Sequence, residues 1–189
     1  MRLDVVPYGN PALRRQSENI KEINEEIITL IDDMAETMSL YQGVGLAAPQ
    51  VGRSKMLFLI NWDLIEHEKS GTQAIINPRI LNAGEETEKQ DEGCLSLPDV
   101  WAPVRRPSVI RVEYMDVDGN LITEELRGMP SRVFQHEYDH LLGILFIDRI
   151  STHERKNVKD ILRSIMDGEI TTSDEIEEIA QSESEIRSD

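Results

Sequence analysis

The chain has 189 residues, enough for one domain with a substantial core, and its 39% hydrophobic and 30% charged residues are typical of a globular protein. Its net charge of −16 argues against direct binding to nucleic acid, which requires basic surface to neutralise phosphates. A single cysteine excludes an internal disulfide framework, no apolar run approaches the ~20 residues of a membrane span, and the N-terminus lacks a signal peptide. We therefore expect a cytoplasmic protein with no membrane partner.

The acidic residues are concentrated at the C-terminus. Residues 167–189 contain nine acidic residues and one basic residue, a net charge of −8 that is half of the total. This segment also has too few apolar residues to build a core. We therefore divide the chain into a folded domain over residues 1–166 and an acidic, flexible tail over residues 167–189.

The first regular element is a helix over about Asn24–Met38. Isoleucine, leucine and methionine recur there at steps of three and four residues, and Asn24 is a suitable N-cap. This apolar stripe predicts core packing.

The motif Gly43–Gln50 follows, with the sequence GVGLAAPQ. Its small residues are compatible with a glycine-rich turn leading into a tightly packed strand. They are equally compatible with an exposed backbone edge for an extended peptide, beside which Gln50 offers an amide donor. The residues alone leave both interpretations open.

Most of the middle of the chain reads as strands and turns. In order, we expect a buried strand at Met56–Ile60, a strand at Ala74–Asn77 ended by Pro78, an irregular edge strand over Arg79–Glu88, an extended segment punctuated by Pro98, Pro103 and Pro107, and strands at Ser108–Met115 and Leu121–Leu126 joined by a turn at Asp118-Gly119.

The most informative stretch is the helix predicted over Ser131–Leu142, which Gly143 ends. It contains the pattern H-E-x-x-H. Residues four apart on a helix differ by about 40° around its axis, so His136 and His140 project from one face and can hold one divalent ion. Glu137 lies beside them, within reach of a water on that ion. The alternative, two histidines placed together by accident, is much less favoured by this spacing.

A catalytic metal site of this kind usually has three protein ligands. The region after His140 offers no third ligand at the spacing found in metalloproteases of the H-x-x-G-x-x-H type. Upstream, the single cysteine Cys94 is a candidate. A lone cysteine is most often a small buried apolar residue, but Cys94 lies between Gly93 and a Leu-Ser-Leu-Pro run, where the backbone can approach a site closely.

The last predicted helix begins at a capping box formed by Ser151 and Glu154. We expect it to bury the apolar residues Val158, Ile161, Leu162, Ile165 and Met166. Strands separated by hairpins, helices near both ends and the absence of βαβ alternation predict an α+β fold, with mainly antiparallel strands packed around the central metal-binding helix.

Three separated motifs together resemble the peptide deformylase family. They are Gly43–Gln50, Glu92–Ser96 and Gln135–His140, in the family's order and at similar spacing, and the resemblance extends over roughly residues 1–165. It implies a catalytic domain over residues 1–166 and an enzyme that removes the formyl group from the N-terminal formyl-methionine of newly made proteins.

The resemblance implies a role for each motif residue in the chemistry. Cys94, His136 and His140 would hold one divalent ion, whose bound water, with a pKa lowered towards ~7, attacks the formyl carbon. Glu137 would act as general base and then as general acid.

The remaining motif residues would bind the reacting groups. The Gln50 amide and the Leu95 backbone N–H would stabilise the oxyanion. Four further residues would receive the substrate: Gly43, Val44, Gly45 and Val133.

Supporting roles are expected for polar residues beside the motifs. Glu92 and Arg106 could form an ion pair, while Gln135 and Asp139 would orient ligands or pack.

By ligand type alone, zinc is the default ion for a site with one cysteine and two histidines. The resemblance instead implies Fe²⁺, with Zn²⁺, Ni²⁺ and Co²⁺ as alternatives. It also implies formyl-Met nascent polypeptides as partners, near the ribosome exit.

Two other functions are less consistent with the sequence. A metallopeptidase would cut internal amide bonds, but a thiolate ligand and the missing downstream ligand argue against it. A non-catalytic protein that binds nascent chains should have lost Glu137 or a ligand, and the chain has lost neither.

Overall fold

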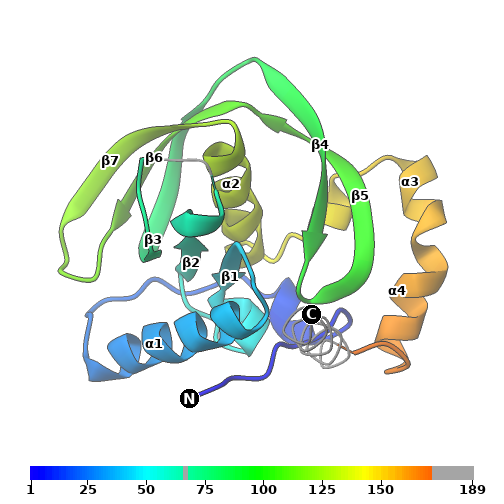
Figure 1. The fold of residues 1–189 in the computed structure, drawn as a ribbon, viewed down its shortest axis with the longest axis horizontal. Coiled ribbons are helices and arrows are strands. Elements are labelled where there is room, and N and C mark those ends of the chain that lie inside the picture. The colour runs from blue at the N-terminus through cyan, green and yellow to red at the C-terminus, as the bar shows by residue number, and fades with distance from the viewer. Residues whose placement is uncertain (66–67, 172–189) are drawn as a thin grey trace, which may run out of the picture.

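The structure, a computed structural model, describes residues 1–65 and 68–171. Figure 1 shows one helix, α2, at the centre, with strands on two sides of it and the other helices outside. The described part of the chain therefore has the predicted α+β fold.

Five strands form an antiparallel sheet in the order β1-β2-β3-β6-β7. Their bounds are Gly45–Ala47 for β1, Leu57–Asn61 for β2, Thr72–Ala83 for β3, Val109–Met115 for β6 and Leu121–Arg127 for β7. β1 is therefore an edge strand of this sheet, paired on one side with β2. The predicted strands at 56–60, 108–115 and 121–126 are confirmed to within a residue or two.

A second sheet consists of a long antiparallel hairpin. Its strands are β4, Thr87–Cys94, and β5, Leu97–Pro107. The sequence predicted β5 as an extended segment, but it did not predict that residues 87–94 would pair with it. β5 contains three prolines, and proline has no backbone N–H to donate to a neighbouring strand. For this reason the sequence did not predict a regular paired strand there.

The helices are α1, Glu25–Leu40; α2, Met129–Leu141; α3, Thr152–Asn157; and α4, Lys159–Met166. Short 3-10 turns cover Pro11–Arg14, Ala48–Val51, Trp62–Leu64 and Phe146–Asp148. The Asn24 side chain caps α1 by accepting a hydrogen bond from the Ile27 N–H at 3.1 Å, as the sequence predicted.

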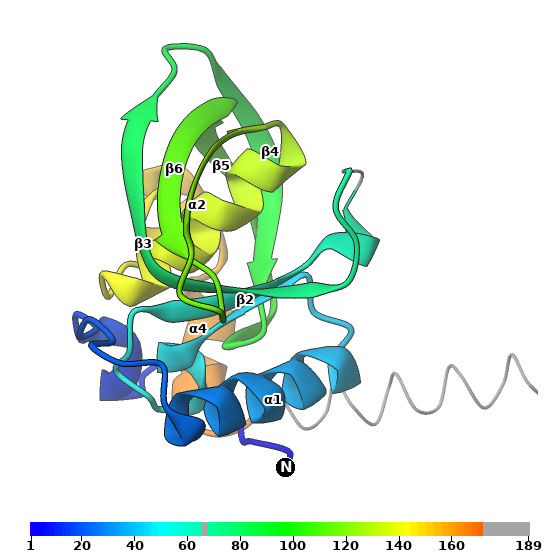
Figure 2. The ribbon, with the colours of Figure 1, turned by 90° about the vertical axis from the view of Figure 1, so that its left-hand side faces the viewer.

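Strand β2 explains how the central sheet supports helices on both faces. Its side chains alternate: Phe58 and Ile60 face the core that contains Phe134 of α2, whereas Leu57 and Leu59 face the core that contains α1. Figure 2 shows β2 between the two helices. A strand buried on both faces reads as a continuous apolar run, which is the pattern of residues 56–60.

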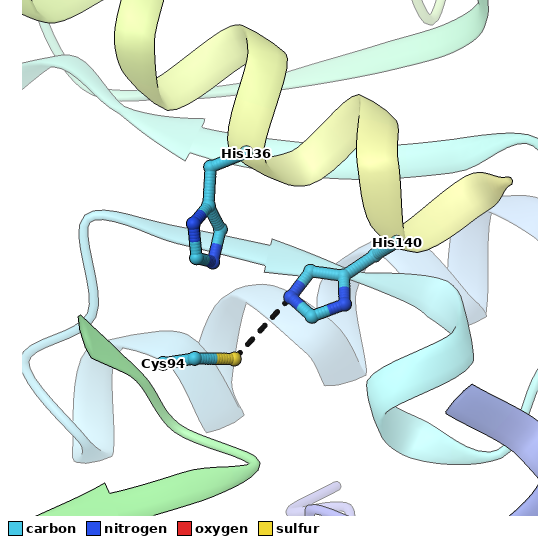
Figure 3. A group of neighbouring side chains, drawn as sticks. All are labelled: Cys94, His136 and His140. Carbon is cyan, nitrogen blue, oxygen red and sulfur yellow. Dashed lines mark hydrogen bonds between the residues drawn. The ribbon is translucent and has the colours of Figure 1, made fainter. Parts of the chain in front are cut away.

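Helix α2 is held to the sheet by one face and carries the histidines on another. Phe134 packs edge-on against Phe58, with ring centroids 5.1 Å apart, and is fully buried. His136 and His140 point towards the β4–β5 hairpin (Figure 3). Gly143, with a φ of +74°, ends the helical region as expected.

The prediction that Pro78 ends a strand was wrong. β3 continues through Pro78 to Ala83, and residues 79–83 pair with the interior strand β6, so they are not an edge strand. A shift of register between Ile76 and Arg79 absorbs the missing N–H of the proline. Asn77 adopts a φ of +50° there and exchanges two 2.8 Å hydrogen bonds with the backbone of Ile20.

The helix predicted after Ser151 is interrupted. The capping box is confirmed, but α3 ends at Asn157 and α4 begins at Lys159. Leu162 and Ile165 are buried as expected, whereas Met166 is 60% exposed. Most of the predicted acidic tail, residues 172–189, lies outside the described residues.

Candidate active site

The structure brings Cys94, His136 and His140 together. Their sulfur and ring-nitrogen atoms all lie within 4.8 Å of one another. The Cys94 sulfur is 3.3 Å from His140 Nε2, and the two imidazole rings are inclined at 78° to each other (Figure 3). One thiol and two imidazoles thus converge on one point.

Local structure explains this convergence. His136 and His140 are one turn apart on α2, so they share a face. Cys94 is the last residue of β4, and its pairing with Leu97 closes the tight turn into β5. The turn is held from outside by Tyr8, whose N–H donates to the Ser96 carbonyl at 2.7 Å.

The Glu92 carboxylate fixes the orientation of His136. Glu92 Oε2 accepts a 2.9 Å hydrogen bond from His136 Nδ1, which leaves the opposite ring nitrogen, Nε2, to face Cys94. The same carboxylate accepts hydrogen bonds from Arg106 at 2.6 and 2.9 Å and from Arg132 at 2.7 Å. The predicted Glu92–Arg106 ion pair is therefore present, within a larger buried cluster.

Burial alone would raise the pKa of Glu92, but the hydrogen bonds from Arg106 and His136 hold it well below its usual range. Glu92 therefore carries a negative charge in the folded protein at any ordinary pH. This charge compensates the two buried guanidinium groups.

Asp139 extends the cluster to the surface. Its carboxylate accepts hydrogen bonds from Arg106 at 2.8 Å and from Arg149 at 2.6 Å. Gln135 donates to the carbonyl of Pro107 and to Ser131. Of the two expectations for these side chains, packing is the one that their contacts match.

The two histidines differ in their affinity for protons. Burial alone would lower the pKa of His136, but the neighbouring Cys94 and Glu92 groups raise it well above its usual value. Burial, His136 and Arg106 lower the pKa of His140 well below its usual value. His140 is therefore a neutral imidazole, and its buried Nδ1 has no hydrogen-bond partner among the described residues.

Glu137 is almost completely buried and faces β1. Burial is the main cause that raises the pKa of its carboxyl to about 7. One carboxylate oxygen, Oε2, has no hydrogen-bond partner among the described residues. The other lies so close to Gly45 that a Cβ at position 45 would overlap it. Glycine at this position therefore makes room for the Glu137 side chain.

Gln50 and Leu95 provide hydrogen-bond donors beside the cysteine. The Gln50 carbonyl oxygen accepts from the Ala47 N–H at 2.8 Å, which orients its amide nitrogen towards the Cys94 sulfur at 3.3 Å. The Leu95 backbone N–H has no partner within the described residues. Both donors lie at the inner end of a cleft.

That cleft has a volume of about 730 Å³. Gly43, Val44, Gly45 and Val133, the four residues predicted to receive a substrate, all line it, together with Gln50, Leu95, Cys94, His136 and Glu137. The edge strand β1 therefore borders the cleft, which supports the second interpretation of the Gly43–Gln50 motif.

Sequence reasoning missed Arg132. Arg132 is buried and donates to Glu92 and to the carbonyls of Val104 and Glu88. Its position four residues before His136 placed it on the buried side of the helix, and a charged residue there could have indicated an ion pair. Trp101 on β5 also lines the cleft, although its side chain is 68% exposed.

Comparison with known proteins assigns the chain to a family. The family model for polypeptide deformylase matches residues 2–156. The peptide deformylase of Thermotoga neapolitana is 44% identical over 161 residues, which cover 83% of this chain and 94% of the relative. The chain belongs to the peptide deformylase family.

Solved peptide deformylase structures share the fold. The crystal structure from Thermotoga maritima has a TM-score of 0.75 and 42% identity, covering 80% of this chain and 99% of that one. The Plasmodium falciparum structure has a TM-score of 0.81 and 36% identity, covering 87% and 95%. Membership of the family implies a metal-dependent enzyme that removes N-terminal formyl groups.

The residues present fit such a metal. A thiolate and two imidazoles are donors that suit Fe²⁺, Zn²⁺, Ni²⁺ or Co²⁺. His140 is neutral, and a cation beside Cys94 would replace the proton that His136 otherwise holds.

In the described ranges 1–65 and 68–171, no helix is long and apolar enough to cross a membrane.

The Glu92 cluster predicts a pH dependence of stability. Because folding lowers the pKa of Glu92 from 4.5, its contribution is fully present above about pH 4.5 and is lost as the pH falls towards the lower folded-state pKa. We expect the free energy of unfolding of metal-free protein, measured in urea, to fall in that acidic range, and Glu92→Gln to show a weaker fall.

Glu22→Gln, which removes one exposed carboxylate, is the matched control and should keep the wild-type pH profile. If the free energy of unfolding of Glu92→Gln fell as steeply at acidic pH as that of the wild type, Glu92 would not be the source of the pH dependence.

Proposed function

We propose that the protein hydrolyses formyl-Met peptides at a divalent ion held by Cys94, His136 and His140. The observation that carries the proposal is the convergence of these three side chains within 4.8 Å at the inner end of a cleft. Such an ion, when bound, supplies Lewis acidity that polarises the formyl group and makes water a better nucleophile near neutral pH.

Glu137 moves the proton in this reaction. Water adds to the formyl carbon and loses a proton to the Glu137 carboxylate, which later gives it to the departing amine, so that formate and a free N-terminus result. A carboxyl with a pKa of about 7 is suited to both steps near neutral pH. Its unpartnered Oε2 is available to hold that proton.

Gln50 and Leu95 stabilise the negative charge that develops on the formyl oxygen. The Gln50 amide is held by Ala47 before any substrate binds, so no reorganisation is needed during reaction. The Leu95 backbone N–H is the second donor.

Val44 and Val133 contact the methionine side chain of the substrate. Both are apolar cleft residues, and Val133 lies one turn before His136 on α2. The peptide backbone pairs along the edge strand β1, where Gly45 has no side chain to obstruct it, and Gly43 leaves similar room in the segment just before the strand.

The catalytic unit spans residues 1–166, and the acidic segment 167–189 is an appendage that catalysis does not need. The substrates are nascent chains near the ribosome exit in the cytoplasm. Co-sedimentation of the protein with translating ribosomes tests that location, and its absence would contradict it.

Replacement of Glu137 tests the mechanism. We expect Glu137→Ala to keep its metal and to lose turnover by about 10²–10⁴-fold, because Glu137 acts on the proton and is not a ligand. The measurement is mass analysis of a formyl-Met tripeptide after incubation, alongside metal content.

The wild type should remove the formyl group and leave the peptide bonds intact. Glu22→Ala, an exposed change of the same kind, should behave as the wild type. Stoichiometric metal with near-normal turnover in Glu137→Ala would refute the role of Glu137, and cleavage of internal bonds would indicate a peptidase.

The ion that we propose is Fe²⁺. A Cys94 thiolate that held Fe²⁺ in this cleft would be exposed to oxygen, and oxidation of Cys94 to a sulfinic acid would remove a ligand. Metal-free protein reconstituted anaerobically with Fe²⁺ should be faster than the Zn²⁺ form and should be inactivated in air, with oxidised Cys94 detected by peptide mass. The Ni²⁺ form should survive longer. Equal rates for Fe²⁺ and Zn²⁺, with Cys94 intact in air, would indicate a zinc enzyme.

A further inference from the structure

The two donors beside the cysteine belong to separate elements of the fold. Gln50 lies in the 3-10 turn Ala48–Val51, whereas Leu95 lies in the turn between β4 and β5. Among the described residues, the hydrogen bonds that join these two elements both come from the Gln50 side chain, at 3.3 Å to Cys94 Sγ and 3.4 Å to Ser96 Oγ. The bond to the hydroxyl is longer than the usual range of about 2.7–3.2 Å. Direct contacts therefore fix the spacing of the two backbones only loosely.

A segment near the N-terminus, Val6-Pro7-Tyr8, bridges the two elements. The Val6 N–H donates to the Gln50 carbonyl at 2.8 Å, and the Tyr8 N–H donates to the Ser96 carbonyl at 2.7 Å. Pro7 between them is exposed and has no N–H, and its ring fixes its φ angle. The segment, dark blue in Figure 1, is therefore a stiff link with one short hydrogen bond to each element.

The link is itself anchored to the rest of the site. The side chains of Val6 and Tyr8 pack against the core cluster that contains Leu97 of β5. Further along the chain, the Ser17 N–H donates at 2.8 Å to the carbonyl of Leu141, the last residue of α2. The N-terminal segment thus contacts all three elements that carry site residues. The loss of one hydrogen bond would leave it attached by the others.

We propose that Val6 and Tyr8 are positioning residues for the oxyanion donors and act through their backbone N–H groups. The first N–H holds the backbone of Gln50, and the second holds the turn that presents the Leu95 N–H, so the N-terminal segment sets the spacing of the two donors. The inference rests on the proposed function, because it takes these donors to stabilise the formyl oxygen. Donors stabilise a developing charge best when their positions are fixed before the reaction.

The test removes one N–H without changing a side chain. Incorporation of the α-hydroxy analogue of valine at position 6 replaces the amide by an ester, which cannot donate to the Gln50 carbonyl. With metal-loaded enzyme and formyl-Met-Ala-Ala, we expect kcat to fall by about 5- to 50-fold, less than the ~10²–10³-fold cost of removing an oxyanion donor. KM and Co²⁺ affinity should stay close to the wild-type values, because no metal ligand changes. The α-hydroxy analogue of tyrosine at position 8 should also lower kcat.

The same segment provides a matched control. The Leu3 N–H donates to Thr37 Oγ1 on α1 at 2.9 Å, and neither residue lines the cleft. An ester at position 3 should therefore keep the wild-type kcat. In Gln50→Ala, the ester at position 6 should cause no further fall in kcat, because it acts through Gln50. A wild-type kcat in the position 6 ester, an equal fall in the position 3 ester, or a full effect in Gln50→Ala would overturn the inference.

A spectroscopic measurement separates this inference from the proposed function. In ¹⁵N-labelled metal-free protein, the side-chain amide resonance of Gln50, assigned by its loss in Gln50→Ala, requires no turnover. It should shift in the position 6 ester and stay unchanged in the position 3 ester. An unchanged resonance in the position 6 ester would refute the positioning role at any level of activity. Failure of the wild type to remove a formyl group would refute only the proposed function, because the resonance still reports whether Val6 positions Gln50.

Discussion

The active site depends on one buried carboxylate, that of Glu92. It receives hydrogen bonds from Arg106 on β5 and from Arg132 and His136 on α2, so it joins the hairpin to the central helix. The loss of one partner from such a cluster leaves a buried charge uncompensated, which typically costs about 3–5 kcal/mol. The same carboxylate aligns His136 with Cys94, two residues further along β4, so the interaction that connects the two parts of the fold also arranges the candidate ligands.

Space is the second constraint on the site. Gly45 on β1 lets the Glu137 carboxylate approach the sheet edge, and Gly93 on β4 lets the Trp101 ring lie on the hairpin. Any larger residue at position 45 would displace the proposed proton carrier, whereas one at position 93 would lift the ring at the outer cleft. The first substitution therefore changes the surroundings of Glu137, and the second changes the wall of the cleft at Trp101.

The sequence predicted what local patterns encode. The H-E-x-x-H helix, the Asn24 cap, the Ser151 capping box and the β6–β7 hairpin follow from periodicity and turn residues, and the structure has all four. It did not predict the passage of β3 through Pro78 or the roles of Arg132 and Arg149, because these depend on contacts between residues far apart in the chain. Cys94 became a convincing candidate ligand only through the family resemblance, since a lone cysteine has no spacing to interpret.

We expect Cys94, His136 and His140 to hold one metal ion in an arrangement maintained by Glu92. Titration of metal-free protein with Co²⁺, followed by absorption spectroscopy, tests it most directly. We expect one ion per chain with a sulfur-to-cobalt charge-transfer band, and the loss of that band in Cys94→Ser. Glu92→Gln should keep the band but bind Co²⁺ with about 10–100-fold weaker affinity. A wild-type spectrum without the sulfur band, or Glu92→Gln with unchanged affinity, would contradict it.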